Sequence, residues 1–192
     1  MRMVTKAPRT RPWTRADLAR LPDDGNRYEV LDGQLLVTPQ ASFPHQYAAS
    51  ELIAALGVYC RQHALGVVVG PGAVPFGKNE LEPDVEVVPV APRDITDTWD
   101  DAPRPILVIE VLSQGTRRRD HGIKREAYLR LGIPEYWVID RFDHCAFIWK
   151  TGATEPLVVT GAIVWTPRAD LPSFEIALDT ILPSGRPSAE AD

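Results

Sequence analysis

Two carboxylates, Asp84 and Glu110, occupy places where an apolar strand would ordinarily carry an aliphatic residue. Glu110 lies inside the run ILVIEVL, residues 106–112, and Asp84 follows Pro83 at the start of the run VEVV. An ionised carboxylate in such a strand loses several kcal/mol of hydration unless a proton, a basic partner or a metal ion compensates. Hard divalent cations such as Mg²⁺ bind a few carboxylates together with waters and substrate phosphates. If the two strands are neighbours, the sequence predicts a site for metal-assisted attack of water on a phosphodiester.

Lys124 is the third candidate, on a helix predicted for residues 120–134. Positions 124, 127, 128 and 131 form one helical stripe, and the lysine is its only charged member. A lysine at the inward end of an apolar stripe needs an acidic partner or a route to water. We therefore expect the ammonium of Lys124 within direct or one-water reach of Glu110, where it could orient water or stabilise a pentavalent phosphate. Taken alone, the same lysine would be a solvated helix residue.

The elements that carry these residues follow from apolar periodicity and turn chemistry. Residues 106–112 are apolar on both faces, which is typical of a central strand covered on both sides. Residues 44–66 show the spacing of an amphipathic helix, and Asp32-Gly33 between two strand-like runs predicts a tight hairpin. Further strands are expected at residues 67–70, 73–76, 82–90, 135–140, 145–150, 156–160 and 162–165. The order helix, three strands, helix, strand favours a mixed sheet flanked by helices, with a crossover of the βαβ kind.

Two stretches, EPDVEVV at residues 82–88 and LVIEVLSQGTRRRDHGIKREAYLRLGIPEYWVID at 107–140, resemble a known family. They look like the Uma-type restriction-endonuclease-like proteins of the PD-(D/E)xK nuclease superfamily, over about residues 28–149. The resemblance implies an α/β (α+β) fold with an α-β-β-β-α-β core, here with an N-terminal hairpin and C-terminal β additions. It also implies a nuclease site dependent on Mg²⁺ or Mn²⁺, in which Asp84 matches the aspartate and Glu110 the (D/E). The superfamily lysine normally stands where this chain has Leu112, and Lys124 resembles the migrated lysine of some branches.

The resemblance also implies supporting roles for two residues of the N-terminal part. Glu29 matches a glutamate that joins the metal cluster in related nucleases, and His45 matches a histidine often found near the site. A histidine at a helix end is also a common structural feature, so both interpretations of His45 stay open. Of the other acids in this part, Glu51 is expected to face solvent. Glu86 shares a strand face with Asp84, as a site neighbour or as plain surface.

The basic stretch after the Glu110 strand has two interpretations as well. Arg117, Arg118 and Arg119 are either a solvated loop or contacts to nucleic-acid phosphates beside the site. One of them could instead pair with Glu110 as a structural ion pair. Asp120 is predicted to cap the N-terminus of the following helix, which would explain it without a role as a ligand.

The length, net charge and cysteine content of the chain limit the possible architecture and partners. With 192 residues, we expect one domain at residues 13–182, a flexible arm at 1–12 and a disordered tail at 183–192. The net charge of −5 speaks against a protein coated in basic residues, so DNA as the substrate would require a local patch or bound cations. No apolar run is long enough to span a membrane, and two distant cysteines fit a reducing, cytoplasmic location. A homodimer is expected, because the apolar side chains of residues 134–150 would otherwise lie uncovered.

Three functions remain compatible with these residues. The first is a metal-dependent endonuclease acting on DNA. The second is a non-catalytic nucleic-acid-binding or regulatory protein that keeps the nuclease fold, which the displaced lysine and the acidic balance favour. The third is a metal-assisted hydrolase of small phosphoesters. Calorimetry with Mg²⁺ or Mn²⁺ separates the second from the others, and a chromogenic phosphodiester identifies the third.

Overall fold

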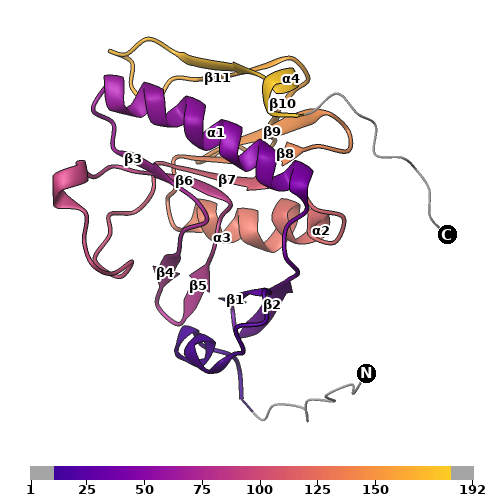
Figure 1. Ribbon diagram of the computed structural model, residues 1–192. Helices are drawn as coiled ribbons and strands as arrows, with labels where there is room; N and C mark the ends of the chain where they lie inside the picture. The colour runs from indigo at the N-terminus through magenta and orange to yellow at the C-terminus, as the bar shows by residue number, and fades with distance from the viewer. Residues whose placement is uncertain (1–10, 183–192) are drawn as a thin grey trace.

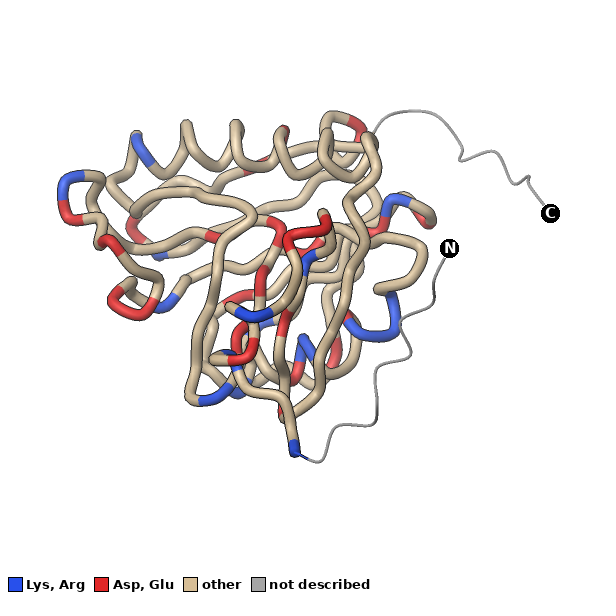
Figure 2. The backbone as a smooth tube through the Cα atoms, turned by 60° about the horizontal axis from the view of Figure 1, so that its bottom comes forward, with Lys and Arg blue, Asp and Glu red and all other residues tan. Residues whose placement is uncertain are grey.

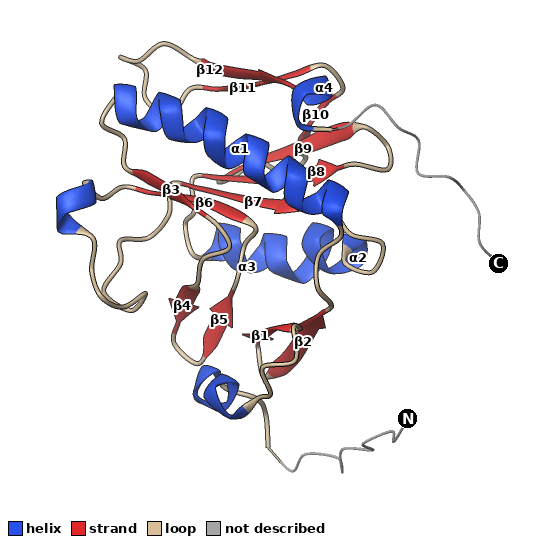
Figure 3. Cartoon of the chain, viewed as in Figure 1, coloured by secondary structure: helices blue, strands red, loops and turns tan. Residues whose placement is uncertain are grey.

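A six-stranded mixed sheet forms the centre of the computed structural model, which describes residues 11–182 (Figures 1 and 3). Its strand order is β10-β9-β8-β7-β6-β3. The bounds are β3 (Val67–Val69), β6 (Val85–Val88), β7 (Leu107–Val111), β8 (Glu135–Asp140), β9 (Cys145–Lys150) and β10 (Leu157–Val159). Strands β7 and β8 are parallel, and the other pairs in the sheet are antiparallel. A parallel pair requires a crossover connection, and a helical segment supplies it here.

Helices cover both faces of this sheet (Figure 1). Helix α1 (Phe43–Gln62) lies on one face. The crossover segment lies on the other and consists of α2 (Arg117–Arg119), the π-helical turn η3 (Asp120–Lys124) and α3 (Arg125–Arg130). Strand β7 alternates between the two cores: Leu107 and Ile109 join the core under α1, whereas Val108 packs in the core that includes Tyr128 of α3. The central, doubly covered strand predicted from its sequence is therefore confirmed.

A second sheet, of order β2-β1-β5-β4, lies on the side of the crossover helix and below the central sheet in Figure 1. Its strands are β1 (Arg27–Leu31), β2 (Gln34–Thr38), β4 (Val74–Phe76) and β5 (Asn79–Leu81). Asp32 and Gly33 both have positive φ, 46° and 81°, as the tight turn of the predicted hairpin requires. Strand β5 is not apparent from periodicity, because the run between Phe76 and Pro83 is mostly polar.

The remaining elements are two 3₁₀ segments, a second hairpin and a short helix. The 3₁₀ helix η1 (Arg15–Arg20) precedes β1, with the backbone N–H of Thr14 donating to Asp17 at 3.0 Å as a capping residue pair. The short 3₁₀ turn η2 (Pro92–Asp94) lies in the loop before β7. The hairpin β11 (Ala162–Trp165) and β12 (Phe174–Ala177), followed by α4 (Leu178–Ile181), packs beside α1. The succession α1-β3-β6-β7-α3-β8 is the expected α-β-β-β-α-β core, with the predicted N-terminal hairpin and C-terminal β additions.

Three other expectations concern the ends and the surface. The arm at residues 1–12, apart from its last two residues, and the tail at 183–192 lie outside the described residues. Within residues 11–182, none of the helices has the length and apolar character needed to cross a membrane. The reason given for a homodimer is wrong, because Tyr136, Trp137 and Trp149 are buried in the cores of the chain itself.

Candidate active site

Asp84, which directly precedes β6, lies opposite Glu110 of the neighbouring strand β7. In the antiparallel pair of β6 and β7, Val85 is opposite Ile109 and Glu86 is opposite Val108. Continuing this register by one residue places Asp84 opposite Glu110, and cross-strand partners point to the same face. The backbone N–H of Val111 donates to Oδ2 of Asp84 at 2.8 Å, which holds the aspartate against β7.

Lys124 reaches Glu110 from the crossover helix. It is 0% exposed, and its Nζ lies 2.6 Å from Oε1 of Glu110 and 2.7 Å from Oε1 of Glu29 in β1. The hydroxyl of Tyr128, one turn later, donates to the same Glu110 oxygen at 3.3 Å. Lys124 thus points towards Glu110, as its place in the apolar stripe of the helix predicts. Direct contact with two carboxylates, from different sheets, joins the three residues into one buried cluster.

The π turn at residues 120–124 changes the role expected for Asp120. The helix begins after Thr116, so Asp120 has helical backbone angles, φ −72° and ψ −38°, and the prediction that it caps the helix is wrong. The turn Ser113–Thr116 starts the helix early, because the Thr116 hydroxyl accepts a hydrogen bond from the N–H of Ser113 at 3.1 Å. Asp120 is instead buried, and burial raises the pKa of its carboxyl although the charge of Lys124 opposes this. Single π turns are frequent at functional sites.

Asp84 is held by two basic side chains of the N-terminal part. Its Oδ1 lies 2.7 Å from Nη1 of Arg27 in β1 and 3.2 Å from Nε2 of His45 in the first turn of α1. Burial alone would raise the pKa of Asp84, but His45 and Arg27 outweigh it, so the pKa lies below its ordinary value. Sequence reasoning placed His45 near the site and missed Arg27, which stands opposite Asp84 only because the second sheet packs against β6.

Negative charge is concentrated around the buried lysine. Burial raises the pKa of Glu110, and the carboxylates of Asp84, Asp120 and Glu29 raise it further, whereas Lys124 lowers it. Burial would lower the pKa of Lys124, but Glu110 and Glu29 outweigh it and keep the ammonium charged. Nearby, burial and Glu29 raise the pKa of Glu82 to about 7. Acids outnumber the two cations, the buried Lys124 and the partly buried Arg27, so the cluster would gain from a further positive charge.

A cleft of about 570 Å³ gives access to the Asp84 side of this cluster. It is bounded by the N-terminal end of α1, strand β2 and the loop 113–116, and Arg27, His45, Asp84, Arg119 and Arg141 are among its lining residues. Charged positions of both signs are interspersed along the chain rather than separated into two faces (Figure 2). Among the residues that line the cleft, Arg27, Arg119 and Arg141 are the basic side chains that an anionic ligand would meet together with His45.

The three consecutive arginines divide between the cleft and the surface. Arg119 lines the cleft and donates from Nη2 to the Thr38 hydroxyl at 2.6 Å. Arg117 lies 2.6 Å from Asp140 and also pairs with Asp143, so acids already hold its guanidinium. Arg118 is exposed. None of the three pairs with Glu110, whose partner is Lys124, so the alternative of an arginine ion pair is wrong.

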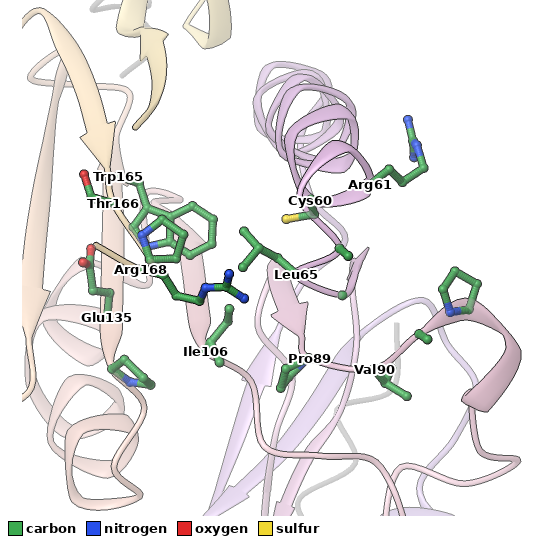
Figure 4. A pocket seen from close by; sticks show the side chains of 16 residues that line it. Cys60, Arg61, Leu65, Pro89, Val90, Ile106, Glu135, Trp165, Thr166 and Arg168 are labelled. Atoms are coloured by element: carbon green, nitrogen blue, oxygen red, sulfur yellow. The ribbon is translucent and has the colours of Figure 1, made fainter. Parts of the chain in front are cut away.

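A second cavity of about 570 Å³ lies at the other end of the strands (Figure 4). Cys60 of the last turn of α1 and Leu65, just after the helix, lie on one side of it, and Trp165 and Arg168 lie on the other. Its lining contains none of the predicted site residues. The cavity therefore lies at the ends of the strands opposite to Asp84 and Glu110 and has no part in the candidate site.

The residues at the site are suited to a hard divalent cation by their chemistry. Within the described residues, no group of three or more His, Cys, Asp or Glu side chains is placed to hold a metal ion. Magnesium needs only one or two protein carboxylates, because waters and substrate phosphates complete its shell. Asp84 and Glu110 supply two, and Oε2 of Glu29 is buried without a hydrogen-bond partner. An all-oxygen set with excess negative charge fits Mg²⁺ or Mn²⁺.

The comparisons with known proteins agree with this architecture. Residues 15–179 match the family Uma2, described as "Putative restriction endonuclease". The chain belongs to the Uma2 family. This Uma2 protein is also similar to the crystal structure of a putative nuclease belonging to DUF820 from Anabaena variabilis ATCC 29413, with a TM-score of 0.67 and 18% identity. The match covers 88% of this chain and 97% of that one and supports the fold, and a search of curated proteins found no match.

Proposed function

We propose that this Uma2 protein is a metal-dependent endonuclease that hydrolyses phosphodiester bonds of DNA. The proposal rests mainly on one observation: a fully buried Lys124 ammonium joins Glu110 and Glu29 on the sheet face that also carries Asp84. Buried ionisable clusters beside a cleft are typical of functional sites, since a purely structural core would use apolar residues. Membership of a family described as putative restriction endonucleases favours the same reading.

In this proposal Asp84 and Glu110 hold Mg²⁺ or Mn²⁺, with Glu29 as a further acid of the cluster. The ion, when bound, would supply a lowered pKa for water and charge stabilisation for the phosphate. Lys124 fixes Glu110 and Glu29 in place and holds a positive charge inside the site. Charges fixed in advance inside a buried site stabilise a developing anion without the cost of reorganising solvent.

The cleft side of the site would handle the substrate. Arg27 and Arg119 line the cleft and present guanidinium groups suited to phosphate oxygens. His45 contacts Asp84 through Nε2, and its Nδ1 is buried without a hydrogen-bond partner. Through this contact His45 is proposed to orient the Asp84 carboxylate towards the bound ion.

Nicking of supercoiled plasmid in the presence of Mg²⁺ or Mn²⁺ tests the proposal. Asp84→Asn and Glu110→Gln are expected to abolish cleavage, with circular dichroism checking that each variant is folded. Glu126→Gln is the matched control, because Glu126 lies on the same crossover helix but is 64% exposed and pairs only with its neighbour Arg125. If either Asp84→Asn or Glu110→Gln cleaves plasmid as well as this control does, the two carboxylates are not the active site.

A non-cleaving nucleic-acid-binding protein is the second candidate. It is favoured by the contacts of the two acids, since Arg27 already pairs with Asp84 and Lys124 with Glu110. Calorimetry separates the candidates: a protein of this kind would bind DNA and give no heat with Mg²⁺ or Mn²⁺. The same experiment on Asp84→Asn shows whether any measured heat comes from this site.

Two further expectations from the sequence stay predictions. A cytoplasmic location is one. A homodimer is the other, and exposed apolar side chains that could take part in such a contact include Phe43 on α1, at 84%, and Leu157 on β10, at 63%. Strand β10 is also an edge of the central sheet, so its backbone could pair with a second chain.

A further inference from the structure

Glu86 is a buried acid that the proposed mechanism does not use. It follows Asp84 by two residues in β6 and lies opposite Val108, on the same face of the sheet as Asp84 and Glu110. The residue is 1% exposed, and its Oε1 has no hydrogen-bond partner. A buried polar group without a partner costs free energy, so its presence calls for a reason.

Glu86 also lines a pocket of about 330 Å³, which shares no lining residue with the cleft at Asp84. The side chains of Trp99, Pro103, Arg104 and Leu131 also line this pocket. A Cβ added to Gly72 would lie 2.0 Å from Oε1 of Glu86 and 2.9 Å from Cη2 of Trp99. The carboxyl and the indole ring therefore meet at this glycine, where no side chain separates them. Trp99 is 41% exposed, so the indole also faces outward.

The lining defines the kind of ligand. An exposed indole face stacks on a flat ring and contributes about 1–3 kcal/mol for a nucleobase. A buried carboxyl oxygen accepts a hydrogen bond from an exocyclic amine, as acidic side chains do from the N4 of cytosine. Arg104 adds a guanidinium at the exposed side of the pocket, suited to a phosphate. A volume of about 330 Å³ suits one small planar ring system rather than a duplex.

We propose that the Glu86–Trp99 pocket binds one unpaired, amine-bearing base, adenine, cytosine or guanine, of the nucleic-acid strand whose phosphate reaches Asp84. This rests on the proposed action on nucleic acid. Glu86 lies about 7 Å along the strand from Asp84, which is close enough for a nucleotide near the bound phosphate to turn its base inward. Thymine lacks an exocyclic amine, so the pocket discriminates against it. Glu86 would read the base and Trp99 would hold the ring.

Binding of labelled single-stranded oligo-dA, oligo-dC and oligo-dT, measured by fluorescence anisotropy in EDTA, tests this pocket without cleavage. The wild-type protein is expected to prefer dA and dC over dT by about tenfold. Glu86→Met should remove the preference and leave affinity for dT unchanged. Trp99→Ala should weaken dA and dC binding by about tenfold, and Trp99→Phe should restore most of it. Glu126→Met on the exposed side of α3 is the matched control.

Protein stability provides a second readout. Glu86→Met replaces a buried, unpartnered carboxyl by an apolar side chain of similar length, so its melting temperature should equal or exceed that of the wild type. A lost base preference in this variant then cannot be attributed to unfolding. Gly72→Ala should also abolish the preference, because its methyl group would displace the Glu86 carboxyl.

Several results would overturn the inference. Equal affinity for the three oligonucleotides, no binding at all, or a preference that survives both Glu86→Met and Trp99→Ala would each do so. Binding of free dAMP or dCMP as tight as that of the oligonucleotides would overturn the assignment to a strand. The proposed nuclease activity is tested separately by plasmid nicking. Plasmid nicking without a base preference in binding would refute only the proposed role of the Glu86–Trp99 pocket. A base preference that depends on Glu86, without any nicking, would refute only the proposed nuclease activity.

Discussion

Replacing the buried lysine tests the reasoning about the cluster most directly. Lys124→Met removes the ammonium that lies 2.6 Å from Glu110 and 2.7 Å from Glu29 and keeps the side-chain length and apolar stem. Breaking a buried ion pair by removing one partner costs about 3–5 kcal/mol, because the remaining charge is left without compensation. We expect a loss of this size in the free energy of unfolding at alkaline pH, where Glu110 is ionised, and it is a large part of the stability of an ordinary domain.

The loss should depend on pH in a defined direction. Burial raises the folded-state pKa of Glu110 above its ordinary 4.5, and removing Lys124, which lowers it, raises it further. A carboxyl with a raised folded pKa destabilises the protein progressively as the pH rises from its unfolded pKa towards its folded pKa. The variant should therefore be closest to the wild type at about pH 5 and furthest from it at about pH 9, because Glu110 is protonated in both proteins below the wild-type folded pKa of about 8.

Urea unfolding followed by circular dichroism at the two pH values measures this difference. Lys150→Met is the matched control, since Lys150 is 63% exposed and lies 3.3 Å from Glu135, so its loss should cost less than about 1 kcal/mol. The double variant Glu110→Gln/Lys124→Met should recover part of the loss, because it removes both partners of the pair. A Lys124→Met protein within about 1 kcal/mol of the wild type at both pH values would refute the cluster as described.

Four further outcomes are expected. Asp84→Asn should lower the melting temperature at neutral pH and progressively less below about pH 4, because the lowered pKa of Asp84 contributes stability above its unfolded value of 3.8 that is lost as the pH falls. Glu86→Met should flatten the decline of wild-type stability between pH 4.5 and about 8, seen in thermal melts, since the raised pKa of Glu86 costs stability as the pH rises. Gly66→Ala should lower the free energy of unfolding in urea by about 2 kcal/mol or more, because the φ of Gly66 is +137° and a Cβ would lie 2.0 Å from the Val88 carbonyl oxygen. Gly25→Ala is its control: the φ of Gly25 is +81° but a Cβ there meets open space, so the loss should be about 1 kcal/mol. Light scattering at micromolar concentration should give twice the monomer mass, and a monomer would contradict the homodimer.

The parts of the fold that the sequence predicts are those set by local patterns. The continuous apolar run in residues 106–112 identifies the central strand, covered on both faces, and Asp32-Gly33 identifies the hairpin. The direction of Lys124 follows from its stripe with Ala127 and Tyr128, and a π turn in place of a regular start does not change it. These features depend on residues within a few positions of one another.

The parts that sequence reasoning missed depend on packing between distant segments. Arg27 pairs with Asp84 because the second sheet lies against the start of β6, and nothing near Arg27 indicates this. Strand β5 was missed as well, although Gly77, with φ 57° and followed by Lys78, offered a turn signal. The burial of residues 136–149 depended on a full set of neighbouring strands, and the apolar run alone was taken for an uncovered surface. Glu86 was placed on the right face, but its lack of a partner is a property of the assembled structure.

The two carboxylates that share the Lys124 ammonium also bear on how the chain is made. Synthesis proceeds from the N-terminus, so Glu29 in β1 leaves the ribosome well before Lys124, and Glu110 leaves before it too. Until the crossover helix exists, burying either acid would leave a charge without its cation. Contacts between segments so distant in the chain are also the slow ones to form. We therefore expect the N-terminal sheet to dock only after the crossover helix has emerged, so that a nascent chain completes this site late in its synthesis.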